Sequence, residues 1–279
     1  MTEQLSKVHP KGWHSSIKFL MIFLISLLIC FEVPKFFSGE VTIYVNVSEI
    51  PAVGEYFSFE IGTIVEIILM GPVFGVLYFI LMKAMLRKID ESQNRKVNYI
   101  YLLEIGAVIL ICLVVMGHIV HLMFDYANAL YRQTYGGYDT TPLFLFLYHS
   151  DEWLGHSMIH IGLFGFIVLA LVSESLMKAQ RRMRWYEIGL SIFFSFGLFV
   201  MNGYATLEGQ CAALLAIMSF ILLLIEIIVI MWKKINPIHY PILFTTIIAN
   251  IIVIGFFTYW IITFGMKPYY PFYFQPSEL

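Results

Sequence analysis

Long apolar stretches separated by short polar ones dominate the pattern of this chain. A helix needs about 20 consecutive apolar residues to cross the hydrocarbon core of a bilayer. Seven stretches fit this requirement, at about 16–33, 60–83, 99–124, 152–176, 185–204, 210–232 and 238–264. The pattern therefore predicts an all-α integral membrane protein, in which residues 1–279 form a single seven-transmembrane helix bundle.

Composition and charge support the membrane assignment and exclude one class of partner. Of the 279 residues, 59% are hydrophobic and 13% are charged, whereas soluble domains carry about 25% charged residues. The mean hydropathy is +0.80. A nucleic-acid groove needs clustered Lys and Arg, and the formal net charge here is −2. We expect a lipid bilayer, and no nucleic acid, as a partner.

The basic residues predict the orientation of the bundle. If the N-terminus is cytoplasmic, the inner segments hold 14 of the 17 Lys and Arg residues. The outer segments then hold Lys35, Arg132 and Lys267. Because cytoplasmic loops carry an excess of Lys and Arg, we expect the N-terminus inside and the C-terminus outside. We expect a multi-pass protein of the cell membrane.

The predicted outer segments differ from the inner ones. Residues 34–58 contain the run Val41-Thr-Ile-Tyr-Val-Asn-Val, whose weak alternation is typical of a short hairpin. Residues 126–148 are rich in Tyr and Phe around Gly136 and Gly137. Since aromatic side chains favour the membrane interface, we expect residues 126–148 to form a loop along the outer surface.

Five of the eight histidines fall in two short stretches, 117–125 and 149–160. These stretches lie at the outer ends of the predicted third and fourth helices. In the first stretch, His118, His121 and Asp125 are spaced i, i+3, i+7. At 3.6 residues per turn this spacing places them on one narrow face of the third helix.

The second stretch carries a matching stripe on the fourth helix. Glu152, His156 and His160 are spaced i, i+4, i+8 and therefore share a face. His149 joins that face if the helix begins early enough. Uniform helical spacing points Asp151 elsewhere.

The two stripes face each other if the helices are antiparallel neighbours. Residues on such helices are level when their numbers have a constant sum. The rise of about 1.5 Å per residue makes the resulting ladder about 10 Å tall. Its three rungs are His118 with His160, His121 with His156, and Asp125 with Glu152.

Imidazoles and carboxylates in register are suited to a transition metal. Ionisable groups are costly in lipid unless they face the bundle interior and find partners. Neutral imidazole binds iron, copper and zinc, and carboxylates compensate charge or orient the ligands. We expect one or two ions, the alternative being a hydrogen-bonded network around a water-filled vestibule. The candidate metal ligands are His118, His121, Asp125, His149, Glu152, His156 and His160.

Carboxylates also supply the candidate catalytic groups. Asp125 and Glu152 can act as ligands or as bases. Glu66, on the outer half of the predicted second helix, falls near the depth of His118 and is a candidate extra ligand or general base. Other carboxylates lie at the predicted inner ends, where we expect them to be solvated or to pair with loop cations. These are Glu104, Glu187 and Glu226.

The histidine cluster favours an enzyme that depends on a metal. Four imidazoles exceed what one hydrolytic zinc ion needs, so the first hypothesis is an iron- or copper-dependent oxidoreductase. Its substrate is small or hydrophobic, and a quinol or an external donor supplies the electrons. The alternative is a zinc-dependent membrane hydrolase of lipids or amides, in which zinc activates a bound water.

Three further functions are weaker alternatives. A transporter of metals should carry polar groups inward from the cluster, but residues 108–116 are apolar. Two haem ligands facing across adjacent helices would leave little room for the macrocycle. The third alternative is a non-catalytic subunit of a membrane complex, in which the histidines are structural and other membrane subunits are partners.

Overall fold

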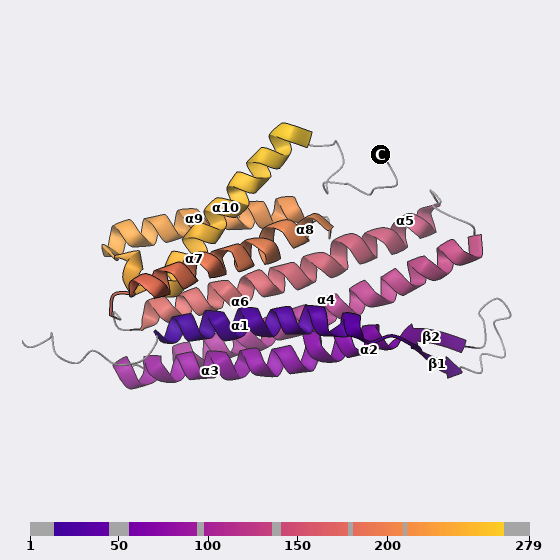
Figure 1. Cartoon of the computed structure of the whole chain (residues 1–279), viewed down its shortest axis with the longest axis horizontal. Helices are drawn as coiled ribbons and strands as arrows, with labels where there is room; N and C mark the ends of the chain where they lie inside the picture. Colours follow the sequence, from indigo (N-terminus) through magenta and orange to yellow (C-terminus); the bar gives the residue numbers. More distant parts are fainter. Residues whose placement is uncertain are drawn as a thin grey trace, which may run out of the picture.

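The computed structural model describes residues 14–44, 56–93, 98–135, 141–177, 181–208 and 211–264. In these residues, seven helices are long and apolar enough to cross a membrane, and they form an elongated bundle (Figure 1). The number of helices agrees with the sequence prediction. Their spans are Ser15–Phe36, Ile61–Arg87, Tyr99–Asn128, Pro142–Leu176, Trp185–Gly203, Ala212–Lys233 and Pro241–Thr263.

The first half of the chain contains three of these spans and a small sheet. The first span is α1 (Ser15–Glu32) followed by the 3-10 helix η1 (Val33–Phe36). The second joins α2 (Ile61–Ile68), the π-helix η2 (Leu69–Val73) and α3 (Phe74–Gln93). The third is α4 (Asn98–Tyr135).

The second half contains the other four spans. The fourth joins α5 (Pro142–His149), the π-helix η3 (Ser150–Gly155) and α6 (His156–Leu176). The fifth is α7 (Trp185–Phe199) with the π-helix η4 (Val200–Tyr204), and α8 (Ala205–Glu208) follows it. The last two are α9 (Ala212–Lys233) and α10 (Pro241–Phe264), joined through the 3-10 helix η5 (Pro237–His239).

The predicted hairpin near residue 41 is present. Strand β1 (Glu40–Tyr44) pairs antiparallel with β2 (Tyr56–Glu60), with Glu40 opposite Glu60 and Tyr44 opposite Tyr56. Among the described residues, the bundle is therefore helical apart from one two-stranded sheet.

The prediction of a loop over residues 126–148 is wrong. Helix α4 continues to Tyr135, and α5 begins already at Pro142, so the fourth span starts ten residues before the predicted residue 152. The side chain of Thr141 caps α5 by accepting a hydrogen bond from the Phe144 N–H, and Pro142 occupies the first turn. Both are signals of a helix start. We call α5 and the part of α4 from Phe124 to Tyr135 the extended arm.

The centre of the bundle is an aromatic core shared by α1, α3 and α6. The rings of Tyr78 and Phe166 stack with their centroids 3.8 Å apart, and the Tyr78 hydroxyl donates a hydrogen bond to the Phe166 carbonyl. Phe23 and Phe74 pack beside them. Large apolar side chains also cover the outside, for example Ile109 and Ile228. An apolar exterior is suited to contact with lipid.

Helices α4 and α6 approach closely because glycines line their contact. A Cβ atom built at Gly117 would lie 2.8 Å from the backbone nitrogen of Ile159. One built at Gly155 would lie 2.8 Å from the Cα atom of His121. Small residues at a helix contact let two backbones come together. The same contact carries the predicted histidine stripes.

Two of the three predicted inner carboxylates have cationic neighbours. Glu187 is buried and accepts hydrogen bonds of 2.6 and 2.7 Å from the guanidinium of Arg181. These hydrogen bonds raise the pKa of Arg181 above its usual value. Glu104 lies 3.9 Å from the amino group of Lys83. The expected pairing with cations is confirmed for Glu187, whose partner lies just before α7.

The expectation for Glu226 is wrong. Its carboxylate is buried between α9 and α10, where the Thr246 hydroxyl and the Asn250 amide donate hydrogen bonds of 2.5 and 3.2 Å. We call Glu226, Thr246 and Asn250 the carboxylate cluster. Sequence spacing placed Glu226 near a helix end, but the facing helix covers it with polar side chains of its own.

The two ends of the bundle differ in charge. The C-terminal ends of α3 and α6, the start of α7 and the connection from α9 to α10 lie at one end (Figure 1). Basic residues gather there, and they include Arg87, Arg181, Arg182, Lys233 and Lys234. The sheet and the extended arm lie at the opposite end (Figure 1).

Candidate metal centre

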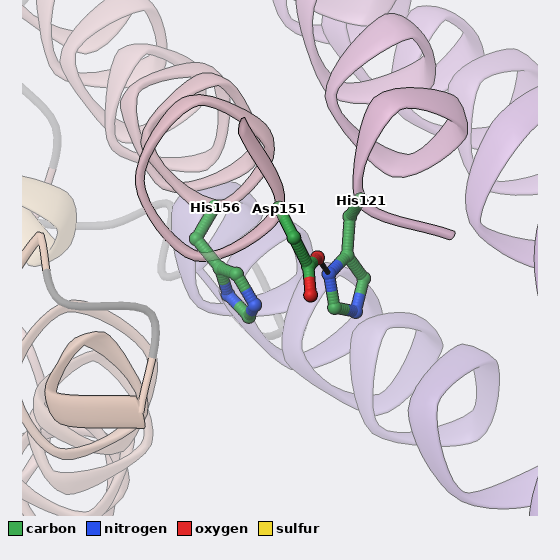
Figure 2. A group of neighbouring side chains, drawn as sticks. All are labelled: His121, Asp151 and His156. Atoms are coloured by element: carbon green, nitrogen blue, oxygen red, sulfur yellow. Dashed lines mark hydrogen bonds and ion pairs between the residues drawn. The ribbon is translucent and has the colours of Figure 1, made fainter. Parts of the chain in front are cut away.

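Three side chains meet at the contact between α4 and the fourth span. His121 comes from α4, Asp151 from η3 and His156 from the first residue of α6 (Figure 2). Each offers one ligand atom, and the three atoms all lie within 4.8 Å of one another. Asp151 is buried, while the two imidazoles are partly exposed. This group, which we call the metal centre, can hold a metal ion.

Asp151 faces His121, which corrects the sequence prediction that it points elsewhere. One carboxylate oxygen of Asp151 lies 2.5 Å from Nδ1 of His121 (Figure 2). The prediction assumed 3.6 residues per turn, but Ser150–Gly155 is a π-helix. A π-helix closes i→i+5 hydrogen bonds, so its wider turn changes the direction of the residues that precede α6.

Close backbone packing fixes the distance between the two sides of the metal centre. Gly155 is the last residue of η3 and lies against the backbone of His121. Gly117 lies one turn away on α4, against the carbonyl of Gly155. As a result the rings of His121 and His156 have their centroids 4.3 Å apart. The two imidazoles that the antiparallel numbering matched are in contact.

Glu152 lies beside the metal centre. Its Oε2 atom is 4.0 Å from Nε2 of His156, which is too long for a direct hydrogen bond. Asp125 lies one turn after His121 on α4, and Glu152 follows Asp151 in η3. Asp125 is exposed, and the metal centre does not include it.

His149 also lies outside the metal centre. Its side chain is exposed, and its ring lies 5.7 Å from the ring of Tyr148, measured between centroids. Sequence spacing placed His149 on the face of His156. The π-helix between the two residues removes that relation, for the same reason that it brings Asp151 in.

The remaining predicted residues lie deeper along the same contact. His118 is buried, and its Nε2 atom lies 3.7 Å from a carboxylate oxygen of Glu66 on α2. Its ring also packs edge-on against Phe31 of α1. His160 is buried and stacks on His156, with ring centroids 6.3 Å apart. The structure brings these side chains beside the metal centre.

A backbone group from another span orients His160. The imidazole makes a hydrogen bond to the backbone of Met201, which belongs to the π-helix η4. A π-turn leaves backbone groups available for other partners. Sequence reasoning missed this contact, because an interior π-turn has no residue signature comparable to a helix cap.

Two imidazoles and one carboxylate are a common ligand set for catalytic metals. Zinc enzymes use two histidines and a carboxylate with water in the open position. Non-haem iron enzymes use the same set with several open positions. An ion bound by these three side chains would therefore keep coordination positions open for a substrate or a water molecule.

The short contact of Asp151 with His121 allows a second arrangement. A histidine that ligates a metal usually donates its other ring N–H to a carboxylate, which fixes the tautomer and the ring orientation. Asp151 at Nδ1 would then present Nε2 of His121 as the ligand atom. In both arrangements Asp151 determines how His121 binds the ion.

Comparisons with known proteins give no relative to support or oppose this interpretation. No protein-family model matches the chain, no curated protein matches it, and no solved structure matches it. The functional conclusion therefore depends on the geometry of the metal centre.

Proposed function

We propose that this protein is an integral-membrane, metal-dependent oxidoreductase that uses iron or copper bound by His121, Asp151 and His156. The observation that carries the proposal is the meeting of two imidazoles and a carboxylate within 4.8 Å between two apolar helices. Ionisable side chains at such a position are costly, and they mark functional sites in membrane proteins.

The number of ligands supports catalysis over a purely structural ion. Structural zinc sites are closed by four protein ligands, whereas catalytic sites keep an open position. Three side chains make up the metal centre in the described part of the chain. The buried imidazoles of His118 and His160 lie beside the metal centre, and four imidazoles exceed what one hydrolytic zinc ion needs, so we favour iron or copper.

Carboxylates near the metal centre are suited to moving protons during turnover. Glu152 lies 4.0 Å from His156, so it can exchange a proton with a group bound at the ion through one water molecule. Asp125 is exposed on the same side and can pass protons onward to solvent. Glu66, beside His118, is a candidate base or ligand at the deeper end.

The charge of the two ends supports an outward-facing site. Basic residues gather at the end opposite the extended arm, and such residues favour the cytoplasmic side. The N-terminus is then inside, the C-terminus is outside, and the metal centre lies toward the outer surface of the cell membrane. A small or hydrophobic substrate, or a quinol, would reach it from outside or from the bilayer.

A zinc-dependent hydrolase is the second candidate, and one observation favours it. The Oε2 atom of Glu152 lies 4.0 Å from Nε2 of His156, and one water molecule could bridge this separation. A zinc ion held by two histidines and a carboxylate activates such a water, and a nearby glutamate accepts its proton. The identity of the bound metal separates the two candidates.

Metal analysis of the purified protein tests the proposal. We expect stoichiometric iron or copper in the wild type, and its loss in a His121→Ala, His156→Ala double variant. A His239→Ala variant, altered at the opposite end in η5, should keep the metal. Zinc alone would select the hydrolase. A wild type that binds none of the three metals, even when they are supplied, would contradict both candidates.

A further inference from the structure

A second set of metal-binding side chains lies next to the metal centre. Glu66 on α2, His118 on α4 and His160 on α6 come from three different spans. His118 and His160 are 3% and 5% exposed. We call Glu66, His118 and His160 the deep set.

The spacing of Glu66 and His118 suits an ion between them. Their nearest oxygen and nitrogen atoms are 3.7 Å apart, beyond the range of a good hydrogen bond. Bonds of about 2.1 Å to a zinc-sized ion, at angles between tetrahedral and trigonal, place two ligand atoms about 3.4 to 3.6 Å apart. The observed distance is close to that range.

His118 has no hydrogen-bond partner among the described residues. Both of its ring nitrogens are buried and neither makes a hydrogen bond. Buried polar groups in proteins are satisfied in the great majority of cases, so an unsatisfied one calls for an explanation. A metal bond to one of the nitrogens would supply it.

His160 presents a nitrogen in the form that a metal requires. One side of its ring is held by the hydrogen bond to the backbone of Met201. Its Nδ1 atom is buried without a hydrogen-bond partner in the described part of the chain. A ring that donates from Nε2 to a carbonyl keeps an unprotonated lone pair on Nδ1.

We propose that the deep set binds a second transition-metal ion, so that the protein holds two ions side by side along the α4 and α6 contact. The proposal deepens the proposed function and rests on it, since the two ions would form one centre. The ligand atoms of the deep set do not all meet the 4.8 Å spacing of the metal centre. Binding therefore draws the His160 ring toward Glu66 and His118.

Counting bound Zn(II) in metal-free protein tests the second site. We expect two equivalents in the wild type and one in a His118→Ala, His160→Ala double variant. A matched control, His149→Ala with His239→Ala, also removes two histidines but touches neither set, and it should bind two equivalents. Equilibrium dialysis followed by elemental analysis gives the count, with thermal unfolding of each variant as the check on folding.

A Glu66→Gln variant keeps the test decisive if the double variant does not fold. The amide has the shape of the carboxylate and lacks its charge, so one of the two equivalents should bind about 10-fold or more weakly. One equivalent in both the wild type and the double variant overturns the second site and leaves the proposed function standing. No bound Zn(II) in the wild type overturns the second site and the zinc hydrolase, and analysis of the same protein for iron and copper then decides whether the metal centre stands.

Discussion

Two buried polar clusters of this bundle have different hydrogen-bonding states. In the carboxylate cluster, both oxygens of Glu226 accept hydrogen bonds from α10. In the deep set, three ring nitrogens of His118 and His160 are buried without a hydrogen-bond partner in the described residues. Both clusters lie between apolar helices, so burial alone does not separate them.

The difference shows which kind of polar cluster points to a ligand. Side chains that hydrogen-bond across helices stabilise a membrane bundle. The carboxylate cluster can do this without a bound ligand, because both oxygens of Glu226 already have donors. In contrast, His118 and His160 have buried ring nitrogens that make no hydrogen bond with the described residues. An unused buried lone pair is therefore better evidence for a metal than a buried charge. Three substitutions test this contrast.

Gly155→Ala should have the largest effect, because it adds a methyl group at the backbone contact between η3 and α4 beside the metal centre. The new methyl group would overlap the Cα atom of His121, and overpacking of this kind costs about 1–3 kcal/mol. We expect a lower unfolding temperature and loss of bound metal. Gly189→Ala is the matched control, since a Cβ atom there meets nothing within 4 Å. Equal behaviour of the two variants would refute the role of the close contact.

Asp151→Asn should weaken metal binding while the protein stays folded. The amide keeps the shape of the carboxylate but loses the charge that holds Nδ1 of His121. Loss of such a partner typically lowers metal affinity by about 10- to 100-fold. Competition with a chelator of known affinity measures the change. Glu226→Gln makes the same chemical change in the carboxylate cluster, and an equal loss of affinity there would erase the contrast between the clusters.

Thr246→Val should have the smallest effect, and the effect should be on stability alone. Valine matches the shape of threonine but cannot donate to Glu226. The loss of one hydrogen bond costs about 1 kcal/mol, which thermal unfolding in detergent can detect. The metal content should equal that of the wild type. A fall in metal content would show that the carboxylate cluster serves the metal centre.

The sequence predicted the elements that depend on regular spacing. Apolar length predicted seven long helices, and 3.6-residue periodicity with antiparallel numbering predicted the contact of His121 with His156. These predictions succeed because α4 is a regular helix throughout and α6 is regular from His156 onward.

The sequence failed where spacing is irregular or where partners come from distant spans. Asp151 was not predicted as a ligand because the π-helix η3 precedes α6, and no residue pattern identifies that turn. The early start of α5 did carry a signal, since Thr141 and Pro142 form a cap and first turn. The environment of Glu226 depends on Thr246, 20 residues away along the chain, and single-helix patterns do not contain it.

The length of α4 links the metal centre to the surroundings of the membrane. Its 38 residues make a rod of about 57 Å, whereas the hydrocarbon core is about 30 Å thick. The Tyr131 hydroxyl pairs with the Thr141 hydroxyl, and the Phe124 and Phe146 rings pack edge to face, so these contacts join α4 and α5 within the extended arm. The arm begins three residues after His121 on the same helix. A helix almost twice as long as the hydrocarbon core is thick must tilt strongly or extend beyond it, so the arm is the part of α4 that can continue the bundle outside the core.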